Sequence, residues 1–461
     1  MALLEFFTGK HLDRGLHVPE HKDLTSGLPI RRLPFAPMLV VPLSQHAGAP
    51  AIPLVHEGQE VVRGEPIAKA GGFMSVPMHS PVTGRVTKLA LAPTARGDLG
   101  MAIYITPYQA ASQEVLYGAP QDIENMTPEE IVQAVQNTGV VGLGGAAFPT
   151  HVKMKVPDGK KIDTVVVNGC ECEPYLTTDH RVMLEYPKDV LYGARIAMRA
   201  LGAANAVIGV EDNKMDAVEA LRNAIDANRT ANVGITVESV PAKYPQGAEK
   251  MLVKVLLGLE VPTRGLPADV GLAVFNVATL AQIGELLPVR QGLIERVVTI
   301  TGPGVRKPGN YLVALGTPLR FALEQADCRD DVSSVILGGP MMGAAAGSLD
   351  IPITKGVTGI LVLTQKEVKA SSQIYACIHC AACVDVCPIH LNPSHLGLLA
   401  RKDRYEEMET DYHLMDCFEC ACCSYVCPSH IPLVQYFRVA KQMNRERANR
   451  ERLKAKEGAH A

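Results

Sequence analysis

Two cysteine runs constrain this chain more than any other feature of its sequence. The first, CIHCAACVDVCP, begins at Cys377, and the second, CFECACCSYVCP, begins at Cys417. Both runs space their cysteines as C-x2-C-x2-C-x3-C, and in both a proline follows the last cysteine. Thiolates prefer soft metals, and four of them at short spacing suit either iron–sulfur clusters or zinc. The C-terminal part of the chain is therefore predicted to fold around metal centres.

The spacing distinguishes between these two kinds of centre. Zinc sites usually combine two C-x2-C pairs that lie a dozen or more residues apart. Three close cysteines and a fourth before proline are instead typical of two-cluster ferredoxins, in which each fourth cysteine binds the other cluster. We therefore predict two [4Fe–4S] clusters with exchanged fourth ligands, and structural zinc is the alternative. The predicted ligands of the first cluster are Cys377, Cys380, Cys383 and Cys427. The predicted ligands of the second cluster are Cys417, Cys420, Cys423 and Cys387.

The composition indicates a cytoplasmic protein of several domains. A chain of 461 residues is too long for one ordinary core. It has no apolar run near the ~18 residues that span a bilayer, and its start, MALLEFFTGKHLDRG, lacks a secretory signal. A net charge of −3 and the absence of Trp argue against nucleic acid as a partner. In a reducing compartment cysteines are more often metal ligands or redox groups than structural disulfides. Four cysteines lie outside the two sets of predicted ligands, namely Cys170, Cys172, Cys328 and Cys422. No third or fourth thiol lies near the first two in sequence, so they are not expected to bind metal; the third is expected in a core, and the fourth is expected to be a small buried residue beside a cluster.

Helix-forming sequence surrounds the second cysteine run. The stretch between Cys387 and Cys417 is too long for a hairpin and rich in helix formers, and the stretch after Cys427 is also helical in pattern. The clusters are therefore expected in a helical ferredoxin-like module. After Tyr436 the chain holds eight Lys and Arg against three Glu, which predicts either a solvated helix or a basic surface for an anionic bilayer or an acidic partner. The eight are Arg438, Lys441, Arg445, Arg447, Arg450, Arg452, Lys454 and Lys456.

A glycine-rich loop follows a well-marked helix in the middle of the chain. Thr127 is the expected N-cap, Pro128 the first helical residue, Glu130 the partner in a capping box, and Gly139 the end of the helix. GLGGAAFPTHVK follows at 142–153, and clustered glycines allow backbone N–H groups to approach phosphate oxygens. Because the loop is neither G-x-G-x-x-G nor a P-loop, a plain glycine-rich turn is the alternative.

The surrounding sequence alternates between strands and helices. A buried-strand pattern at 162–168 is followed by helical patterns near 188–202, 213–228 and 246–257, with NAVIGVED and GITVESV between them. This alternation predicts a mostly parallel, covered sheet whose ligand loops lie at the carboxyl ends of the strands. NGCECEP and FNVATL stand at two such ends.

An N-terminal β module precedes this region. Residues 36–106 contain G-x-x-V-x-x-G-x-x-I and then HSPVTGRV, which resembles a lipoyl-type barrel sandwich. The tip of its hairpin, AGGFMSVPMHSP, contains no lysine, so a structural domain without a swinging arm is expected. The histidines His46, His79 and His151 are expected at the surface or in packing rather than on a metal.

Four motifs in order, GVVGLGGAAFPTHVK, NGCECEP, YPQGAEK and FNVATL, resemble the flavin- and NADH-binding subunit of respiratory complex I. With the N-terminal and cluster segments, from about residue 20 to about residue 440, the chain resembles the RnfC family of Rnf electron-transport complexes. The resemblance implies a noncovalent FMN reduced by NADH on a Rossmann-like domain, with electrons leaving through two [4Fe–4S] clusters. It also implies a multidomain α/β fold, in which residues 292–365 resemble the ligand-binding β-grasp domain of the same relatives. The expected modules are an extension (1–35), a barrel sandwich (36–106), the FMN- and NADH-binding domain (120–290), the β-grasp domain (291–365), the two-cluster domain (366–440) and a basic tail (441–461).

The resemblance also assigns roles to residues. Glu173 and Phe148 are the implied catalytic residues on the nicotinamide side. The residues implied to hold the FMN phosphate and ring edge are Gly142, Gly144, Gly145, Lys153, Asn276 and Thr279. Those implied to line the isoalloxazine ring or to face it from another loop are Asn168, Glu171, Tyr244, Gly247 and Glu249. The chain departs from complex I at Leu143, where the relative has Arg, and at Cys170 and Ala248, where it has acids.

These roles imply an electron-input subunit that oxidises NADH reversibly. The implied partners are ferredoxin and the other subunits of an ion-translocating complex, at the cytoplasmic face of the bacterial inner membrane and attached peripherally. Two alternatives remain at this point. One is a flavoprotein like cobalamin reductase, which is expected to lack the module at 36–106, and the other is an iron–sulfur module without flavin.

Overall fold

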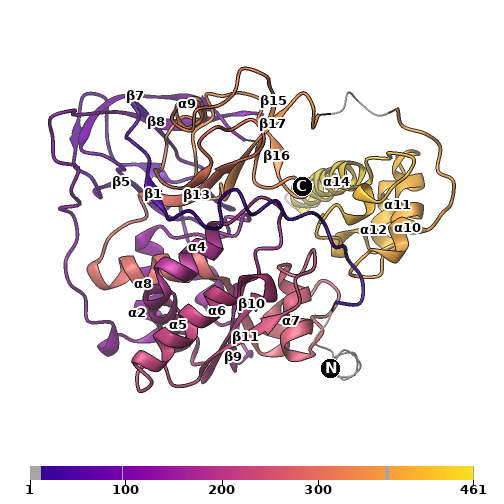
Figure 1. Cartoon of the computed structure of the whole chain (residues 1–461), viewed down its shortest axis with the longest axis horizontal. Helices are drawn as coiled ribbons and strands as arrows, with labels where there is room; N and C mark the ends of the chain where they lie inside the picture. The colour runs from indigo at the N-terminus through magenta and orange to yellow at the C-terminus, as the bar shows by residue number, and fades with distance from the viewer. Residues whose placement is uncertain (1–11, 96, 369–372, 460–461) are drawn as a thin grey trace. The chain divides into compact units, whose positions relative to one another are not determined.

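The computed structural model describes residues 12–95, 97–368 and 373–459, and it divides them into two compact units (Figure 1). The larger unit consists of Pro19–Ala242 and Pro267–Val368. The smaller unit consists of Lys243–Leu266 with the described parts of Met1–Val18 and Lys369–Ala461. Residues 1–11 of the expected extension, 369–372 of the expected cluster domain, 460–461 of the expected tail and the side chain of Lys456 lie outside the described residues.

The N-terminal module of the larger unit is made of two small antiparallel sheets. The first has the order β2 (Leu39–Pro42), β8 (Leu99–Pro107), β7 (Gly84–Pro93) and β4 (Glu60–Val61). The second has the order β3 (Ile52–Pro53), β5 (Pro66–Lys69) and β6 (Met78–His79). Buried Leu39, Ile67 and Ile103 belong to the core that the two sheets share with the rest of the unit. The sandwich expected at 36–106 is therefore present, and its hairpin tip lies between β5 and β6.

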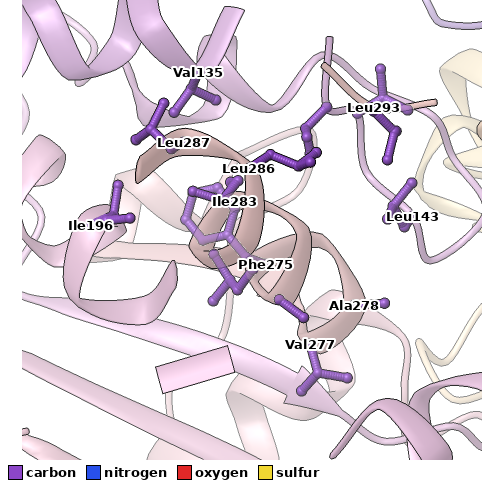
Figure 2. Packing of buried hydrophobic residues seen from close by; sticks show 14 of the residues in the cluster. Val135, Leu143, Ile196, Phe275, Val277, Ala278, Ile283, Leu286, Leu287 and Leu293 are labelled. Carbon is purple, nitrogen blue, oxygen red and sulfur yellow. The ribbon is translucent and has the colours of Figure 1, made fainter. Parts of the chain in front are cut away.

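The middle of the larger unit is a four-stranded parallel sheet covered by helices. Its order is β11 (Ile235–Val240), β10 (Asn205–Glu211), β9 (Thr164–Gly169) and β12 (Leu272–Asn276). Its main helices are α2 (Pro128–Thr138), α3 (Thr150–Met154), α4 (Thr178–Glu185), α5 (Pro187–Leu201), α6 (Met215–Ala227) and α8 (Val277–Leu286). Figure 2 shows Ile283 and Leu286 of α8 packed among buried apolar side chains that include Val135 and Phe275. Helix α5 meets α8 at Gly193, where a Cβ atom would overlap the Leu280 carbonyl oxygen.

The helix before the glycine loop begins and ends where the sequence predicts. The Thr127 side chain accepts from Glu130 N, the Glu130 side chain accepts from Thr127 N, and Pro128 occupies the first turn. Gly139 ends α2 with φ 71°, in the left-handed region that favours glycine. These short-range predictions are confirmed.

The last part of the larger unit is a six-stranded mixed sheet. Its order is β1 (Arg31–Arg32), β14 (Gly309–Ala314), β13 (Glu295–Thr301), β17 (Gly359–Thr364), β15 (Val332–Leu337) and β16 (Ala344–Ala345). Helix α9 (Leu319–Gln325) packs its apolar side chains against this sheet. Strand β1 comes from the N-terminal extension and pairs in parallel with β14, so the chain before residue 36 contributes to this domain.

The smaller unit is helical. It contains α7 (Glu249–Leu257), α10 (Ala382–Asp385), α11 (Pro393–Ala400), α12 (Tyr405–Thr410), α13 (Cys422–Tyr425) and α14 (Leu433–Ala459). Its two cysteine runs repeat the same backbone, because Ala381 and Ala421 both have φ 63° and each precedes a short helix. The helical surroundings predicted for the clusters are therefore confirmed.

Candidate functional site

The four cysteines predicted for the first cluster line one hollow. They are Cys377, Cys380, Cys383 and Cys427, and the last of them comes from the second run. The Cys377 Sγ also lies 3.7 Å from the Ser394 Oγ at the start of α11. Within the described residues no three His, Cys, Asp or Glu side chains converge on a single ion. The thiolates of a [4Fe–4S] cluster bind different irons and surround a cage, so a thiol-lined hollow fits the cluster.

The cysteines of the second set lie deeper in the smaller unit. Cys387 and Cys423 are buried, and burial raises the pKa of Cys417 to about 11. Burial also raises the pKa of Cys387, and the nearby Cys420 raises it further. Neutral buried thiols become thiolates when metal supplies the compensating charge, so this donor set also fits a cluster. Cys422, between two predicted ligands, is fully buried, as expected for a small side chain beside a cluster.

Backbone and side-chain contacts close the glycine loop of the larger unit. Gly142 N donates to Phe148 O at 2.8 Å, and Ala147 N donates to Gly142 O at 3.1 Å. Leu143 N donates to the Thr279 Oγ1 of α8 at 2.9 Å. The buried Arg296 guanidinium donates to Leu143 O at 3.3 Å, and burial lowers its pKa to about 10. The structure thus joins the loop to the N-terminus of α8, two places that the motifs predicted for the same phosphate.

The loop is tight on one side and open on the other. A Cβ on Gly144 would lie 3.4 Å from the Asn276 side chain, whereas Gly145 has φ 113° and no atom within 4 Å of a Cβ position. Asn276 caps α8, because its Oδ1 accepts from Thr279 N at 3.2 Å. Lys153 Nζ donates to Val274 O at 2.9 Å, which holds its charge beside the middle of β12. Exposed glycine backbone, a helix N-terminus and a lysine fit an anionic phosphate group.

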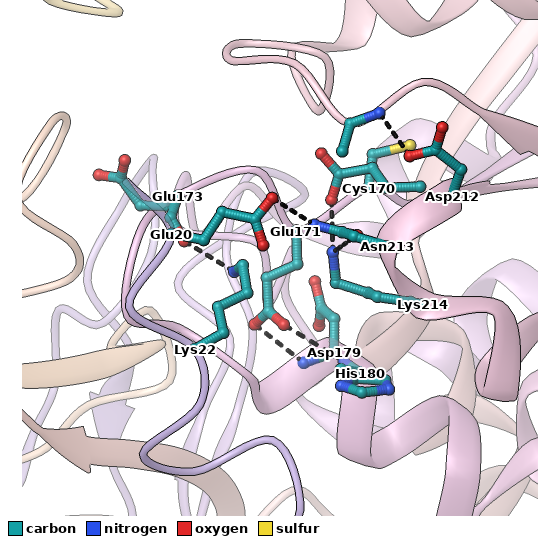
Figure 3. A network of polar contacts seen from close by, with 12 residues as sticks. Glu20, Lys22, Cys170, Glu171, Glu173, Asp179, His180, Asp212, Asn213 and Lys214 are labelled. Atoms are coloured by element: carbon teal, nitrogen blue, oxygen red, sulfur yellow. Dashed lines mark hydrogen bonds and ion pairs between the residues drawn. The ribbon is translucent and has the colours of Figure 1, made fainter. Parts of the chain in front are cut away.

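Acidic side chains follow β9, and Figure 3 shows Glu171 directed toward the start of α4, where Asp179 and His180 lie. Buried Glu171 accepts from Asp179 N at 3.0 Å and from His180 N at 3.3 Å, so it caps α4. Asp179 accepts from the Asn276 Nδ2 at 2.6 Å, and burial together with the nearby Glu171 raises its pKa to about 7. The Asn168 Oδ1 accepts from Cys170 N at 3.1 Å. Glu171 and Asn168 therefore shape the turn after β9.

Glu173 makes a different set of contacts. Its Oε1 accepts from Met341 N at 3.1 Å and from Met342 N at 2.7 Å. Its Oε2 is buried and has no hydrogen-bond partner among the described residues. Burial raises the pKa of this carboxyl to about 7. Lys22 Nζ donates to Glu173 O at 2.9 Å. The sequence suggested neither Lys22 nor the two methionines, because backbone contacts so distant in the chain leave no local pattern.

Three predicted residues lie in the smaller unit rather than with the glycine loop. Tyr244 OH donates to Cys420 O at 2.7 Å, Glu249 begins α7, and Gly247 lies between them. Phe148 stays in the larger unit, half-buried, with its carbonyl bonded to Gly142 N. The facing position of Tyr244, Gly247 and Glu249 therefore stays a prediction.

The hairpin tip of the barrel sandwich contacts the two helices that flank the glycine loop. Gln136 Nε2 of α2 donates to Gly72 O at 3.1 Å and to Ser75 O at 3.0 Å. The His151 Nε2 of α3 donates to Phe73 O at 2.7 Å. The tip that lacks a lysine thus braces the helices before and after the loop. The histidine is a packing residue, as expected, and His46 and His79 are likewise buried.

Four known protein families match successive segments of the chain. The RnfC barrel sandwich hybrid domain matches residues 10–109, the Nuo51 FMN-binding domain 135–285, the SLBB domain 297–345 and a 4Fe-4S dicluster domain 376–431. The described residues contain no helix long and apolar enough to cross a membrane. The matches confirm the predicted fold class and the predicted cofactors, FMN and two iron–sulfur clusters.

Two relatives cover nearly the whole chain. The C subunit of the proton-translocating ferredoxin:NAD(+) oxidoreductase complex of Clostridium ljungdahlii is 42% identical over 95% of each chain. The C subunit of the Na(+)-translocating ferredoxin:NAD(+) oxidoreductase complex of Acetobacterium woodii is 41% identical over 86% of this chain and 89% of that protein. The crystal structure of NAD+-reducing [NiFe]-hydrogenase in the H2-reduced state shares the fold, with a TM-score of 0.51 at 19% identity over 68% of this chain and 61% of that one.

Proposed function

The chain belongs to the RnfC family of electron-transfer subunits, and from this premise we propose that it exchanges electrons between NADH and ferredoxin through FMN and two [4Fe–4S] clusters. FMN supplies the conversion between a two-electron hydride donor and one-electron clusters. The names of the relatives support ferredoxin and NAD(+) as the redox partners. The module at 36–106, which separates this proposal from a protein like cobalamin reductase, lies within the matched segment 10–109.

One observation carries the proposal: the glycine loop at 142–149 bonds to Thr279 at the N-terminus of α8 and leaves its Gly145 side open. We assign the FMN phosphate to this cradle, with Gly144 and Gly145 giving close access to the backbone and Lys153 adding positive charge. Gly142 closes the loop through its bond to Phe148 O, and Asn276 orients Thr279. These contacts use groups that the loop already fixes, so little order is lost when the phosphate binds.

We assign NADH to the side of Glu173 and Phe148, by resemblance to the complex I motif. Asn168 and Glu171 hold the turn that carries Glu173, since one bonds to Cys170 N and the other caps α4. By the same resemblance, Tyr244, Gly247 and Glu249 are proposed as nucleotide residues, and Tyr244 OH donates to Cys420 O. The exchanged ligand sets and the module boundaries given by the sequence are part of the same proposal.

We also propose peripheral attachment to the cytoplasmic face of the membrane complex, through helix α14. Part of its basic character serves the smaller unit itself, because Arg438 lies 3.1 Å and Lys441 3.0 Å from Glu419. Arg447 lies 2.5 Å from Glu406. The exposed basic residues left for an acidic partner or an anionic bilayer are Arg445, Arg450, Arg452 and Lys454.

The test is anaerobic purification of the full chain, followed by flavin, iron and sulfide analysis and by titration with NADH. We expect one FMN and about eight irons per chain, and bleaching of both flavin and cluster absorption by NADH. Reduced ferredoxin should restore NADH from NAD+ in the complete complex. Glu173→Gln should keep flavin and clusters, reduce slowly with NADH and reduce fully with dithionite. Stoichiometric zinc without acid-labile sulfide, or a flavin that NADH leaves oxidised, would refute the proposal.

A further inference from the structure

The turn Gly338–Gly343, between β15 and β16, is shaped around the Glu173 side chain. Two of its amides, Met341 N and Met342 N, donate to the same Glu173 Oε1 at 3.1 and 2.7 Å. A Cβ on Gly339 would overlap Glu173 Cγ and lie 2.6 Å from Cδ and 2.8 Å from Oε1. Only glycine at 339 therefore allows the carboxylate to occupy this place.

The backbone of the loop that carries Glu173 is held by a second part of the chain, the Glu20–Lys22 segment. Lys22 Nζ donates to Glu173 O at 2.9 Å and to Leu176 O at 2.5 Å, and the Lys22 side chain is buried (Figure 3). Tyr175 N donates to Glu20 O at 2.8 Å. Both holding elements, the Glu20–Lys22 segment and the turn, lie outside the matched FMN-binding segment 135–285. The position of Glu173 is therefore set not only by the turn after β9 but also by parts of the chain outside the flavin domain.

Burying the Glu173 carboxylate in this contact has an unfavourable free energy, which a purely structural residue would not need to bear. The Glu173 Oε2 is buried and has no hydrogen-bond partner among the described residues, and burial raises the pKa of the carboxyl. An unpaired buried carboxylate oxygen is unfavourable, and an apolar side chain would fill the same space at less cost. Acidic residues whose pKa is shifted by burial are found most often at functional sites.

We propose that the turn Gly338–Gly343 is a positioning element of the nucleotide site: it sets where the Glu173 carboxylate lies and thereby the affinity for the nicotinamide end of NADH. This inference rests on the proposed function, in which Glu173 acts on NADH. The turn itself touches Glu173, and no contact between the turn and the dinucleotide is required. The bond that the turn fixes is charge-assisted, so its loss should weaken binding about tenfold or more.

The experiment measures binding of NAD+ and of ADP-ribose to the oxidised full chain by calorimetry. Gly339→Ala should raise the Kd of NAD+ about tenfold and leave the Kd of ADP-ribose, which lacks nicotinamide, unchanged. Met342→Pro removes the N–H that donates to Glu173 at 2.7 Å, and it should also raise the Kd of NAD+. It replaces Gly339→Ala in the experiment if that variant folds poorly. Gly347→Ala is the matched control, since no atom lies within 4 Å of its Cβ position. Flavin and iron contents should equal those of the wild type in every variant.

A double-mutant cycle separates positioning from general damage. Glu173→Ala removes the atoms that the Gly339→Ala methyl would displace, so Gly339→Ala should have little effect on NAD+ in that background. An undiminished effect there, or wild-type NAD+ affinity in a flavin-replete Gly339→Ala protein, overturns the inference while leaving the proposed function intact. Wild-type NAD+ affinity in Glu173→Ala refutes both the assigned role of Glu173 and the inference. A wild-type chain that NADH does not reduce refutes the proposed function itself.

Discussion

Replacing Lys355 by methionine should remove a rise of stability with pH. Lys355 is buried, and its Nζ donates to Pro77 O at 3.0 Å and to Gly139 O at 2.7 Å. Its backbone N donates to the Gln45 Oε1 at 3.1 Å. One side chain thus joins the barrel sandwich, the end of α2 and the segment before β17. Because both Nζ acceptors are neutral carbonyls, burial lowers the Lys355 pKa from 10.5 to about 7.

The sign of the effect follows from this lowered pKa. Between pH 7 and 10.5 the unfolded chain binds more protons at Lys355 than the folded chain does, so the free energy of unfolding increases with pH. From pH 7 to pH 9 the increase is about 2 kcal/mol, which corresponds to on the order of 2–3 °C in melting temperature for a protein of this size. At any single pH, Lys355→Met also leaves two carbonyls without a donor, at about 1–3 kcal/mol each. The slope is therefore the diagnostic quantity.

The assay compares melting temperatures of the full chain at pH 7, 8 and 9 under anaerobic conditions. Lys69 is an exposed lysine on β5, so Lys69→Met is the matched control. The increase of melting temperature with pH that Lys355 contributes should be present in the wild type and in Lys69→Met and absent from Lys355→Met. Neighbouring His79 does not complicate this range, because burial and Lys355 lower its pKa to about 3 and it stays neutral. Parallel pH dependence in Lys355→Met and the wild type would refute the reasoning.

Three further predictions concern the cofactors and the tail. Gly144→Val should yield protein with clusters but little flavin by absorption, because a Cβ already meets the Asn276 side chain at 3.4 Å; a flavin-replete variant that oxidises NADH normally would contradict this. Cys387→Ser should disturb the cluster on the Cys417 side more than the other in EPR spectra, and the opposite loss would restore one cluster per run. Deleting residues 445–461 should weaken attachment to membranes and make the remainder less salt-sensitive, and unchanged fractionation at all salt concentrations would leave a solvated helix.

Local patterns predicted much of the fold. The capping box at Thr127 and Glu130 and the glycine that ends α2 depend on residues a few positions apart, and the structure confirms them. The parallel strands β9 to β12 follow from runs of buried residues in a sequence that alternates with helices. The cysteine spacing likewise led to the module now matched as a dicluster domain.

Long-range polar contacts could not be predicted in the same way. Lys22, Lys355 and Arg296 are cationic residues, which the sequence gives every reason to place at the surface, yet all three are buried. Each is stabilised by backbone carbonyls, for example Lys22 by Glu173 O and Leu176 O, 151 and 154 residues away. Every residue has a backbone carbonyl, so the sequence does not show which residues will accept hydrogen bonds from a buried lysine. The turn that holds Glu173 was missed for the same reason, because it uses amide groups rather than side chains.

The division into units shows a further limit of reading modules in order along the chain. The expected flavin domain, 120–290, and cluster domain, 366–440, are consecutive blocks in the sequence. The structure instead takes Lys243–Leu266 out of the first block and packs it with the cysteine runs. Tyr244 OH donates to Cys420 O at 2.7 Å, and Arg264 N donates to the Asp416 Oδ1 at 3.0 Å. This excursion leaves the sheet after β11 and returns before β12, so the chain runs from the sheet into this segment and back again. Lys243–Leu266 contains a motif that the resemblance assigns to the nucleotide. Its contacts show that the same segment also packs beside Cys420, a predicted ligand of the second cluster.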